Sequence, residues 1–254
     1  MQKRLSLKQL KPNVMIGGAI ILEIKKVFER RKINNMQENI TTIYLIRHST
    51  KFNPNMIDIY NSTDNEQLKT EKKMLSVEGE KRAELLAKQE EFKNIDALYS
   101  SNYVRAMQTA KYFMEENNVK LNIDERFNER KTGIVDKNKY PDFFVRQYLN
   151  ENFKMNDGES QIEVRKRMTE AFWEVVKNNR NKRSIIVSHG TAISFLLMNW
   201  CKLLDIQENL LRKLEFNGKI IINRIYKAPE VFKILINDAN NIVDICNIEF
   251  EELR

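Results

Sequence analysis

From residue 40 onwards, short apolar runs alternate along the chain with stretches of helical periodicity. The apolar runs predict buried strands at residues 41–46 (TTIYLI), 94–100 (NIDALYS), 120–123 (KLNI) and 183–188 (RSIIVS). The periodic stretches predict helices at residues 75–92, 101–118, 158–179 and 191–204. Alternation of this kind is typical of a doubly wound α/β domain with a mainly parallel sheet.

Capping signals mark the starts of two of these helices. Ser76 is the expected N-cap of the helix at 75–92, and Ser160 with Glu163 forms a capping-box pattern at 158–179. The polar stretch 50–74 predicts a long loop or an insertion.

The pattern changes after residue 205. Residues 231–237 and 242–250 are apolar runs on either side of DANN, and they predict a C-terminal β-hairpin over 231–250. Residues 214–226 predict one further strand.

Charge is concentrated at the N-terminal end. Residues 1–35 hold nine basic and two acidic residues, which leaves only +1 of the net charge of +8 for the rest of the 254-residue chain. A nucleic-acid partner is therefore not expected. Cys201 and Cys246 form no metal-type cluster, and we expect reduced thiols in a cytoplasmic protein.

The basic segment, residues 1–38, is treated apart from the domain at 39–254. Its apolar run at 14–22 has about half the ~20 residues that a membrane span needs. Three interpretations stand: a helix packed on the domain, a dispensable extension with the true start at Met36, or contact with a membrane surface through residues 14–33. The third is the least favoured.

The chain has two histidines, and each follows a predicted strand. His48 comes after the strand at 41–46, and His189 after the strand at 183–188. Ligands of open α/β sheets bind beyond the carboxyl ends of the strands. We therefore expect both imidazoles at one edge of the sheet.

The neighbours of these histidines suit an anion. Arg47 adjoins His48, and Arg105 stands in the first turn of the helix at 101–118. Gly190 follows His189 and opens a helix whose N-terminus favours negative charge. Such a group predicts a phosphate site, where a neutral imidazole attacks phosphorus and arginines grip the oxygens.

Several motifs then occur in a recognisable order: LIRHS (45–49), YSSNYVRAMQTA (99–110), FNERKTG (127–133), GES (158–160) and IIVSHGTA (185–192). This ordered set resembles the histidine phosphatase superfamily, also called the phosphoglycerate mutase-like family. The resemblance spans residues 40–205. It implies a three-layer α/β/α domain with a mixed, mainly parallel central sheet.

The resemblance also implies roles for single residues. His48 is expected to accept the phosphoryl group, and Glu129 to act first as general acid and then as general base. Arg47, Arg105 and His189 are expected to bind the phosphate, with Gly190 beside them. Neither a metal nor another cofactor is implied.

The sequence departs from the family pattern just after His48. The family commonly has Gly and then Glu-Thr there, whereas Ser49, Thr50 and Lys51 follow here. A phosphate-binding Asn is common a few residues later. Pro54 takes that place, with Asn53 and Asn55 on either side, and Asn53 is our candidate phosphate contact.

Residues 131–157 are expected to pass near the mouth of the site. The segment carries several aromatic residues that either shape the leaving-group side or, the favoured interpretation, pack a helix onto the core: Phe143, Phe144, Tyr148 and Phe153.

The function predicted from these observations is hydrolysis of a small phosphorylated substrate, by a metal-independent phosphohydrolase of the histidine acid phosphatase type. A phosphoglycerate mutase-type phosphotransferase is the alternative, since it would use the same catalytic residues. A non-catalytic module that binds a phosphorylated ligand is the third candidate. The oligomeric state stays open.

Overall fold

The computed structural model describes residues 39–53, 65–136 and 138–251. The chain divides into two units, Met1–Asn39 and Ile40–Arg254, of which only the second lies almost wholly within these ranges. The predictions for residues 1–38 therefore fall outside the described residues.

A six-stranded mixed sheet forms the centre of the domain, with the strand order β3-β2-β4-β1-β8-β9. Its strands are β1 (Thr41–Arg47), β2 (Ala97–Ser100), β3 (Leu121–Ile123), β4 (Arg183–Ser188), β8 (Glu230–Ile236) and β9 (Ile242–Ile248). The first four are mutually parallel, and the β8–β9 hairpin continues the sheet antiparallel to β1. The predicted mainly parallel sheet and the predicted C-terminal hairpin are both confirmed.

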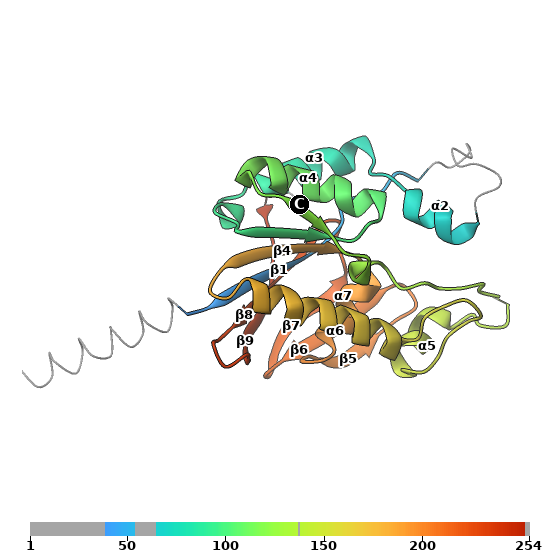
Figure 1. Ribbon diagram of the computed structural model, residues 1–254. Helices are drawn as coiled ribbons and strands as arrows, with labels where there is room; N and C mark the ends of the chain where they lie inside the picture. Colours follow the sequence, from blue (N-terminus) through green and yellow to red (C-terminus); the bar gives the residue numbers. More distant parts are fainter. Residues whose placement is uncertain (1–38, 54–64, 137, 252–254) are drawn as a thin grey trace, which may run out of the picture. The chain divides into compact units, whose positions relative to one another are not determined.

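Helices cover both faces of this sheet. Figure 1 shows α3 (Val77–Ala87) and α4 (Val104–Asn117) on one side, and α6 (Gln161–Asn178) with α7 (Gly190–Leu197) on the other. Alternation along β1 supplies the two cores, because neighbouring side chains of a strand point to opposite faces. Ile43 and Leu45 pack in the core beneath α6 and α7, whereas Tyr44 and Ile46 pack in the core beneath α3 and α4.

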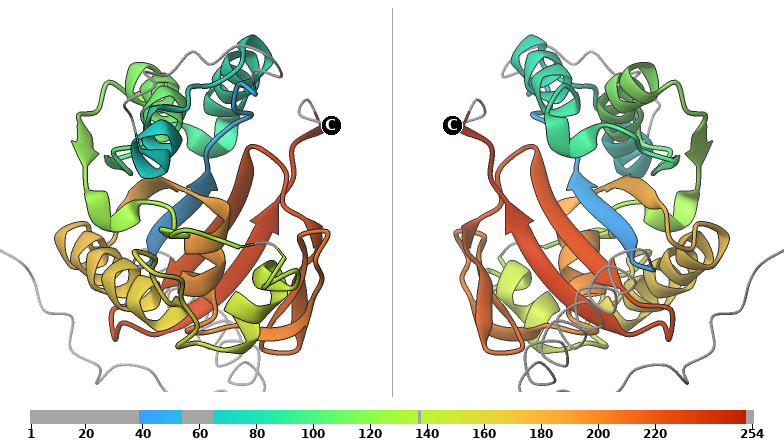
Figure 2. Two further views of the ribbon diagram at one scale, coloured as in Figure 1. Left: turned by 90° about the vertical axis from the view of Figure 1, so that its right-hand side faces the viewer. Right: turned by 90° about the vertical axis from the view of Figure 1, so that its left-hand side faces the viewer.

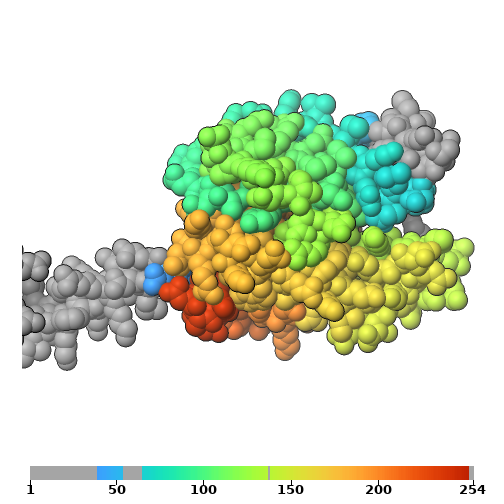
Figure 3. Space-filling model, viewed as in Figure 1, coloured from blue at the N-terminus to red at the C-terminus, as the bar shows by residue number. Residues whose placement is uncertain are grey.

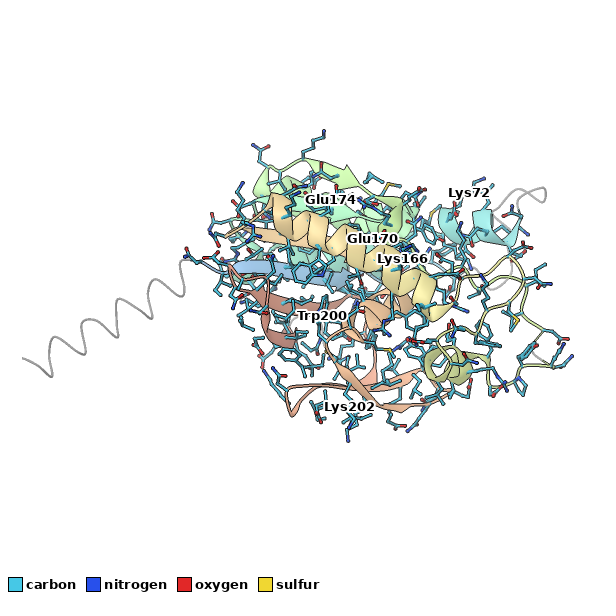
Figure 4. All side chains as sticks on the ribbon, turned by 60° about the horizontal axis from the view of Figure 1, so that its bottom comes forward. Lys72, Lys166, Glu170, Glu174, Trp200 and Lys202 are labelled. Atoms are coloured by element: carbon cyan, nitrogen blue, oxygen red, sulfur yellow. The ribbon has the colours of Figure 1, made fainter. Side chains whose placement is uncertain are left out.

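The predicted capping signals are present at the helix starts. The Ser76 hydroxyl accepts a hydrogen bond from the backbone N–H of Gly79, and Ser160 with Glu163 forms a complete capping box. The outward face of α6 is charged, as Lys166, Glu170 and Glu174 show in Figure 4. This helix is amphipathic, with its apolar side against the sheet.

Two predictions near the C-terminus were wrong. The helix predicted at 191–204 ends at Leu197, and the chain then enters β5 (Lys202–Ile206). The single strand predicted at 214–226 is a hairpin of β6 (Leu211–Phe216) and β7 (Lys219–Ile225). Asn217 and Gly218 form its turn with φ values of 49° and 82°, the signature of an Asn-Gly hairpin turn.

Strands β5, β6 and β7 form a separate antiparallel sheet. Figure 2 shows this second sheet in orange beside the red β8–β9 hairpin. Buried side chains of β6 and β7 join the core that also holds α6 and α7. The apolar residues near 200 therefore serve a second sheet, not a longer helix.

The remaining elements are short. α2 (Glu66–Lys72) lies within the polar stretch predicted as a loop, and α5 (Phe143–Leu149) lies within the segment 131–157. The predicted helix at 75–92 is split, because α3 ends at Ala87 and a 3₁₀ turn, η1 (Glu90–Phe92), follows it. A second 3₁₀ turn, η2 (Glu125–Phe127), precedes Glu129.

Candidate functional site

The two histidines meet at the carboxyl edge of the central sheet. β1 and β4 are parallel neighbours with Arg47 opposite Ser188, so the next residue of each strand is a histidine. The backbone N–H of His48 donates to the carbonyl of Ser188 at 2.9 Å. The ring centroids of His48 and His189 lie 5.2 Å apart. The structure thus brings together the residues that the sequence placed at one edge.

The hydrogen bonds of His48 define its tautomer. Its Nδ1 lies 2.7 Å from the carbonyl oxygen of Ser49, which can only accept, so Nδ1 carries the proton. The other ring nitrogen, Nε2, accepts a hydrogen bond from Nε of Arg105 at 3.1 Å. Burial, with the charges of Arg105 and Arg47, lowers the pKa of His48 well below its ordinary value of 6.5. The ring is therefore neutral at pH 7, with a lone pair on Nε2.

His189 is held in the opposite tautomer. The hydroxyl of Ser101 donates its hydrogen bond to Oδ1 of Asn128. Its oxygen is therefore the acceptor for Nε2 of His189, which donates to it at 2.8 Å. Its Nδ1 accepts from Nη2 of Arg105 at 3.2 Å. Burial and the nearby Arg105 also lower the pKa of His189. The ring of Tyr103 packs edge-on against it, with centroids 4.8 Å apart.

Arg105 joins the two rings from the first turn of α4. Its Nη1 donates to the carbonyl of Thr70 at 2.7 Å, which ties α2 to the site. The same helix also positions the His48 loop, since Oγ1 of Thr109 accepts from the N–H of Ser49 and donates to the carbonyl of Arg105. Thr109 was not singled out from the sequence, where a mid-helix threonine gives no signal.

Arg47 and Gly190 lie on the other side of His48. Nη1 of Arg47 donates to the carbonyls of Tyr226 and Lys227 at 2.7 and 2.9 Å. Its Nε is buried without a hydrogen-bond partner among the described residues. A Cβ built on Gly190 would lie 3.5 Å from that Nε, so the start of α7 packs directly on Arg47.

Glu129 lies at the N-terminus of α7. Its carboxylate accepts hydrogen bonds from the backbone N–H groups of Thr191 at 3.2 Å, Ala192 at 2.9 Å and Arg130 at 2.9 Å. Negative charge is favoured there, because the first N–H groups of a helix have no intrahelical partners. The Glu129 carboxylate therefore lies at the N-terminus of the helix whose N-cap residue is His189.

Arg167, on α6, holds the segment that carries Glu129. Its guanidinium donates to the carbonyls of Arg126, Asn128 and Glu129 at 2.8, 2.8 and 3.3 Å. It also pairs with Glu159, at 2.8 Å. Arg167 cannot be recognised from the sequence, because an arginine in a charged helix gives no sign of which loop its guanidinium contacts.

A cleft of about 980 Å³ is lined by Glu129 and by Thr70, whose carbonyl accepts a hydrogen bond from Arg105. Figure 3 shows the cyan α2 segment and the yellow-green chain after Glu129 at the same end of the molecule. α2 also reaches the histidines, since Nε2 of Gln67 donates to the hydroxyl of Tyr103 at 2.6 Å. The lining residues are Asn65, Glu66, Gln67, Thr70, Glu129, Arg130, Thr132, Gly133, Ile134, Val135 and Asp157.

Two of the four aromatic residues, Phe144 and Tyr148, follow the favoured interpretation and pack on the core. Tyr148 is buried and packs on Phe195 of α7, with centroids 4.9 Å apart, and Phe144 packs on Tyr148 at 5.3 Å. Phe143 and Phe153 form a separate contact at 5.9 Å. Packing onto the core is therefore the main role of this helix.

The phosphate contact proposed for Asn53 stays a prediction. Its side chain is exposed and makes no hydrogen bond with the described residues. Pro54 and Asn55 fall outside them. No group of three or more His, Cys, Asp or Glu residues in the described ranges could hold a metal ion. Within the same ranges, no helix is long and apolar enough to cross a membrane.

Comparison with known proteins gives consistent matches. The family model described as "Histidine phosphatase superfamily (branch 1)" matches residues 43–234. A Yersinia enterocolitica protein named "Probable phosphoglycerate mutase GpmB" is 25% identical over 61% of this chain and 72% of its own length. "Phosphoserine phosphatase 1" of Hydrogenobacter thermophilus is 30% identical over 52% of this chain and 65% of its own length.

Solved structures share the fold at lower identity. The Bacillus stearothermophilus YhfR structure superposes with a TM-score of 0.60 at 17% identity, over 84% of this chain and 100% of that one. The structure of a mycobacterial glucosyl-3-phosphoglycerate phosphatase superposes with a TM-score of 0.56 at 17% identity, over 82% of this chain and 96% of that one.

Proposed function

This chain belongs to the histidine phosphatase superfamily (branch 1), and we propose that it is a phosphomonoester hydrolase working through a phosphohistidine on His48. One observation carries the proposal. Nε2 of His48 is unprotonated and accepts a hydrogen bond from Arg105, which also donates a hydrogen bond to His189. A buried, neutral imidazole beside guanidinium groups is the arrangement that nucleophilic attack on a phosphate requires.

In the first step, the hydrogen bond from Nε of Arg105 to Nε2 of His48 breaks as the phosphate enters, and Arg105 donates to the phosphoryl oxygens instead. The freed lone pair on Nε2 attacks phosphorus, and the bond from phosphorus to the alcohol oxygen of the substrate breaks. Arg105 and Arg47 stabilise the negative charge on the phosphoryl oxygens, with His189 as a further contact. Glu129 gives its proton to the departing oxygen. It lines the cleft in which the leaving group would lie, which is the position that this role requires.

In the second step, water attacks the phosphohistidine. Glu129, now a carboxylate, takes one proton from this water as the new oxygen–phosphorus bond forms. The bond from phosphorus to Nε2 of His48 breaks, and inorganic phosphate leaves with the ring restored. No metal ion takes part in the proposed sequence.

A mutase is the second candidate, favoured by the relative that is named as a phosphoglycerate mutase. It would return the phosphoryl group from His48 to another hydroxyl of the substrate instead of to water. Both reactions use the same five side chains, so product analysis separates them. Isomerisation of phosphoglycerate faster than release of inorganic phosphate would favour the mutase.

The test is turnover of p-nitrophenyl phosphate in the presence of EDTA. We expect the protein to release p-nitrophenol, and His48→Ala to abolish this release. Lys166→Ala is the matched control, because Lys166 is exposed on the outer face of α6. Equal turnover by the His48→Ala protein would refute the proposal, and binding of phosphate without any turnover would favour a non-catalytic module.

A further inference from the structure

The turn between β7 and β8 lies against the phosphate side of the site. Nη1 of Arg47 donates to two of its carbonyls, those of Tyr226 and Lys227, at 2.7 and 2.9 Å. The next carbonyl, of Ala228, accepts from Oγ1 of Thr50 at 3.1 Å. Three consecutive carbonyls of this turn therefore bind the end of β1 and the loop that follows it.

The two carbonyls determine which edge of the Arg47 guanidinium is left for a ligand. Nη1 carries two N–H bonds, and the carbonyls of Tyr226 and Lys227 accept both of them. The edge formed by Nε and Nη2 remains, and Nε is buried without a hydrogen-bond partner among the described residues. This edge has two parallel N–H bonds, the geometry that binds two oxygens of a phosphate. The position of the turn therefore orients Arg47 for an anion.

Glu230 binds this turn from the other side. It is the first residue of β8, 2% exposed, and stands opposite Arg47 in the antiparallel pair of strands. Its carboxylate accepts from the backbone N–H of Lys227 at 2.7 Å. That N–H belongs to the same peptide group as the Tyr226 carbonyl, and the two point in opposite directions across a trans peptide. One peptide group thus connects a buried carboxylate to the guanidinium, and each hydrogen bond polarises the other.

The Glu230 carboxylate is itself fixed by residues of both sheets. Arg224 of β7 pairs with it, with Nη2 2.9 Å from Oε1, and Nδ2 of Asn247 in β9 donates to the same oxygen at 2.7 Å. The second sheet and the β8–β9 hairpin lie side by side in Figure 2, and the Arg224–Glu230 pair joins them. A buried carboxylate with this many donors has a defined position.

The charge of Glu230 also acts on Arg47. Burial and the positive charge of Arg212 lower the pKa of Arg47, whereas the carboxylates of Glu129 and Glu230 raise it. Arg212 lies behind the turn, with its guanidinium carbon 4.5 Å from the ring centre of Tyr226. Glu129 is protonated in the proposed first step, so of these two carboxylates only Glu230 keeps its charge throughout.

We propose, on the basis of the phosphoryl-transfer function above, that Glu230 is a positioning residue for the phosphate site. It acts on Arg47 through the peptide group between Tyr226 and Lys227, and Arg224 holds its carboxylate in place. It touches neither the substrate nor the reacting atoms. The second sheet, which supplies Arg224, thereby contributes to the binding of phosphate.

The test measures the dissociation constant of inorganic phosphate by titration calorimetry, together with KM and kcat for p-nitrophenyl phosphate. Glu230→Met has a similar length but no acceptor for the N–H of Lys227. We expect the dissociation constant to rise by about tenfold, as for a hydrogen bond to a charged group. KM should rise with it and kcat should change less, because Arg47 binds the phosphate before the transition state as well as in it. Glu230→Gln keeps one acceptor oxygen and should restore most of the affinity.

Glu249→Gln is the matched control. Glu249 also pairs with Arg224, at 2.7 Å, but is partly exposed and accepts no backbone N–H of the turn. Its dissociation constant for phosphate should stay within about twofold of the wild type, as for other surface ion pairs.

A double-mutant cycle separates positioning from a general loss of structure. In an Arg47→Met background, Glu230→Met should change the dissociation constant of phosphate by less than about twofold, since its effect passes through the missing guanidinium. A residue that only stabilised the fold would add its full factor in both backgrounds. If Glu230→Met does not fold, Glu230→Asp replaces it, because the shorter side chain keeps the charge but withdraws the acceptor from Lys227.

The outcomes distinguish this proposal from the hydrolase proposal. An unchanged dissociation constant in the folded Glu230 variant, or an equal rise with and without Arg47, would overturn the positioning role while the wild type still binds phosphate and turns over p-nitrophenyl phosphate. A wild-type protein that binds phosphate without turnover would contradict the hydrolase alone, and the dissociation constants would still decide on Glu230. If the wild type binds no phosphate, both proposals fail.

Discussion

Nε of Arg105 donates a hydrogen bond to Nε2 of His48 over 3.1 Å, and both groups are buried at the carboxyl edge of the sheet. This contact exists only because Nδ1 of His48 carries the ring proton and donates a hydrogen bond to the carbonyl of Ser49. The backbone that follows the strand therefore selects which ring nitrogen faces the arginine. The nitrogen that we propose as the nucleophile is therefore oriented by the protein itself.

Arg105→Lys should lower kcat/KM for p-nitrophenyl phosphate by about 100- to 1000-fold, the range for removal of one transition-state donor. A lysine keeps the positive charge but cannot span both rings, because its donors radiate from one nitrogen. The control is Arg165→Lys, on the surface of α6, where the arginine binds Asn199. A loss of less than fivefold in Arg105→Lys would show that the two-ring contact is unimportant.

Glu129→Gln should affect substrates according to their leaving groups. An alkyl alkoxide needs a proton to depart, so turnover of glycerol 3-phosphate should fall by about 100- to 10,000-fold. p-Nitrophenolate departs without a proton, so the first step on p-nitrophenyl phosphate should be nearly unaffected. Pre-steady-state release of p-nitrophenol measures that step, and an equal loss for both substrates would mean that Glu129 is not the general acid.

Arg167→Met should reduce the same alkyl-phosphate activity through the loop that it holds. Without this guanidinium, three carbonyls around Glu129 lose their donor, so the carboxylate shifts relative to the leaving oxygen. We expect kcat to fall by about tenfold or more with a smaller change in KM, since geometry at the reacting atoms affects kcat first. If Arg167→Met lost only thermal stability and kept its kcat, Arg167 would have a structural role alone.

Stability should fall when the solution is acidified through pH 6.5. The folded-state pKa of both His48 and His189 is lowered, so between that lowered value and about 6.5 the unfolded chain binds more protons than the folded chain. The free energy of unfolding should then decrease by up to about 1.4 kcal/mol per pH unit for each histidine. Urea titrations at pH 7.5, 6.5 and 5.5 measure this slope.

The His48→Gln protein is the control for this pH dependence, because it keeps only His189. Its slope between pH 6.5 and 5.5 should be about half that of the wild type. An unchanged slope would contradict a neutral, buried His48. Activity should behave differently from stability, because kcat/KM should stay level from pH 7 down to 6 while His48 keeps its lone pair.

Gly79→Ala should destabilise the protein near the His48 loop. A Cβ at this position of α3 would clash with the carbonyl oxygen of Thr50, and backbone atoms cannot move aside easily. We expect a loss of about 1–3 kcal/mol in the free energy of unfolding, as for other overpacked sites. Lys81→Ala, an exposed position on the same helix, should change it by less than about 0.5 kcal/mol.

The sequence predicted most of the central sheet because its strands are buried on both faces. Residues 41–46 and 183–188 are largely apolar runs, and a histidine follows each within two residues, so their common edge followed from parallel pairing alone. The helix over 191–204 was too long, because apolar side chains that pack in a second sheet look the same in a pattern as those of a buried helix. The segment 214–226 holds most of a hairpin instead of one strand, and Asn217-Gly218 is the turn that divides it.

The residues that the sequence could not identify are those whose role depends on long-range contacts. His48, His189 and Glu129 came from position and resemblance, but Arg167 acts on a loop about forty residues earlier in the chain. Arg212 is an ordinary strand arginine until β6 folds against α5 and β7 and encloses it in aromatic rings. Such residues are recognised only from their contacts.

The most direct measurement of the central claim is to trap the phosphoenzyme. Rapid acid-free quenching during turnover, followed by mass spectrometry of peptides under alkaline conditions, should find one phosphoryl group on the peptide that contains His48. The modification should be absent from the His189 peptide, stable to alkali and lost in acid, and His48→Ala should show none. A phosphoryl group on a different residue, or substrate turnover by His48→Ala at the wild-type rate, would contradict the account.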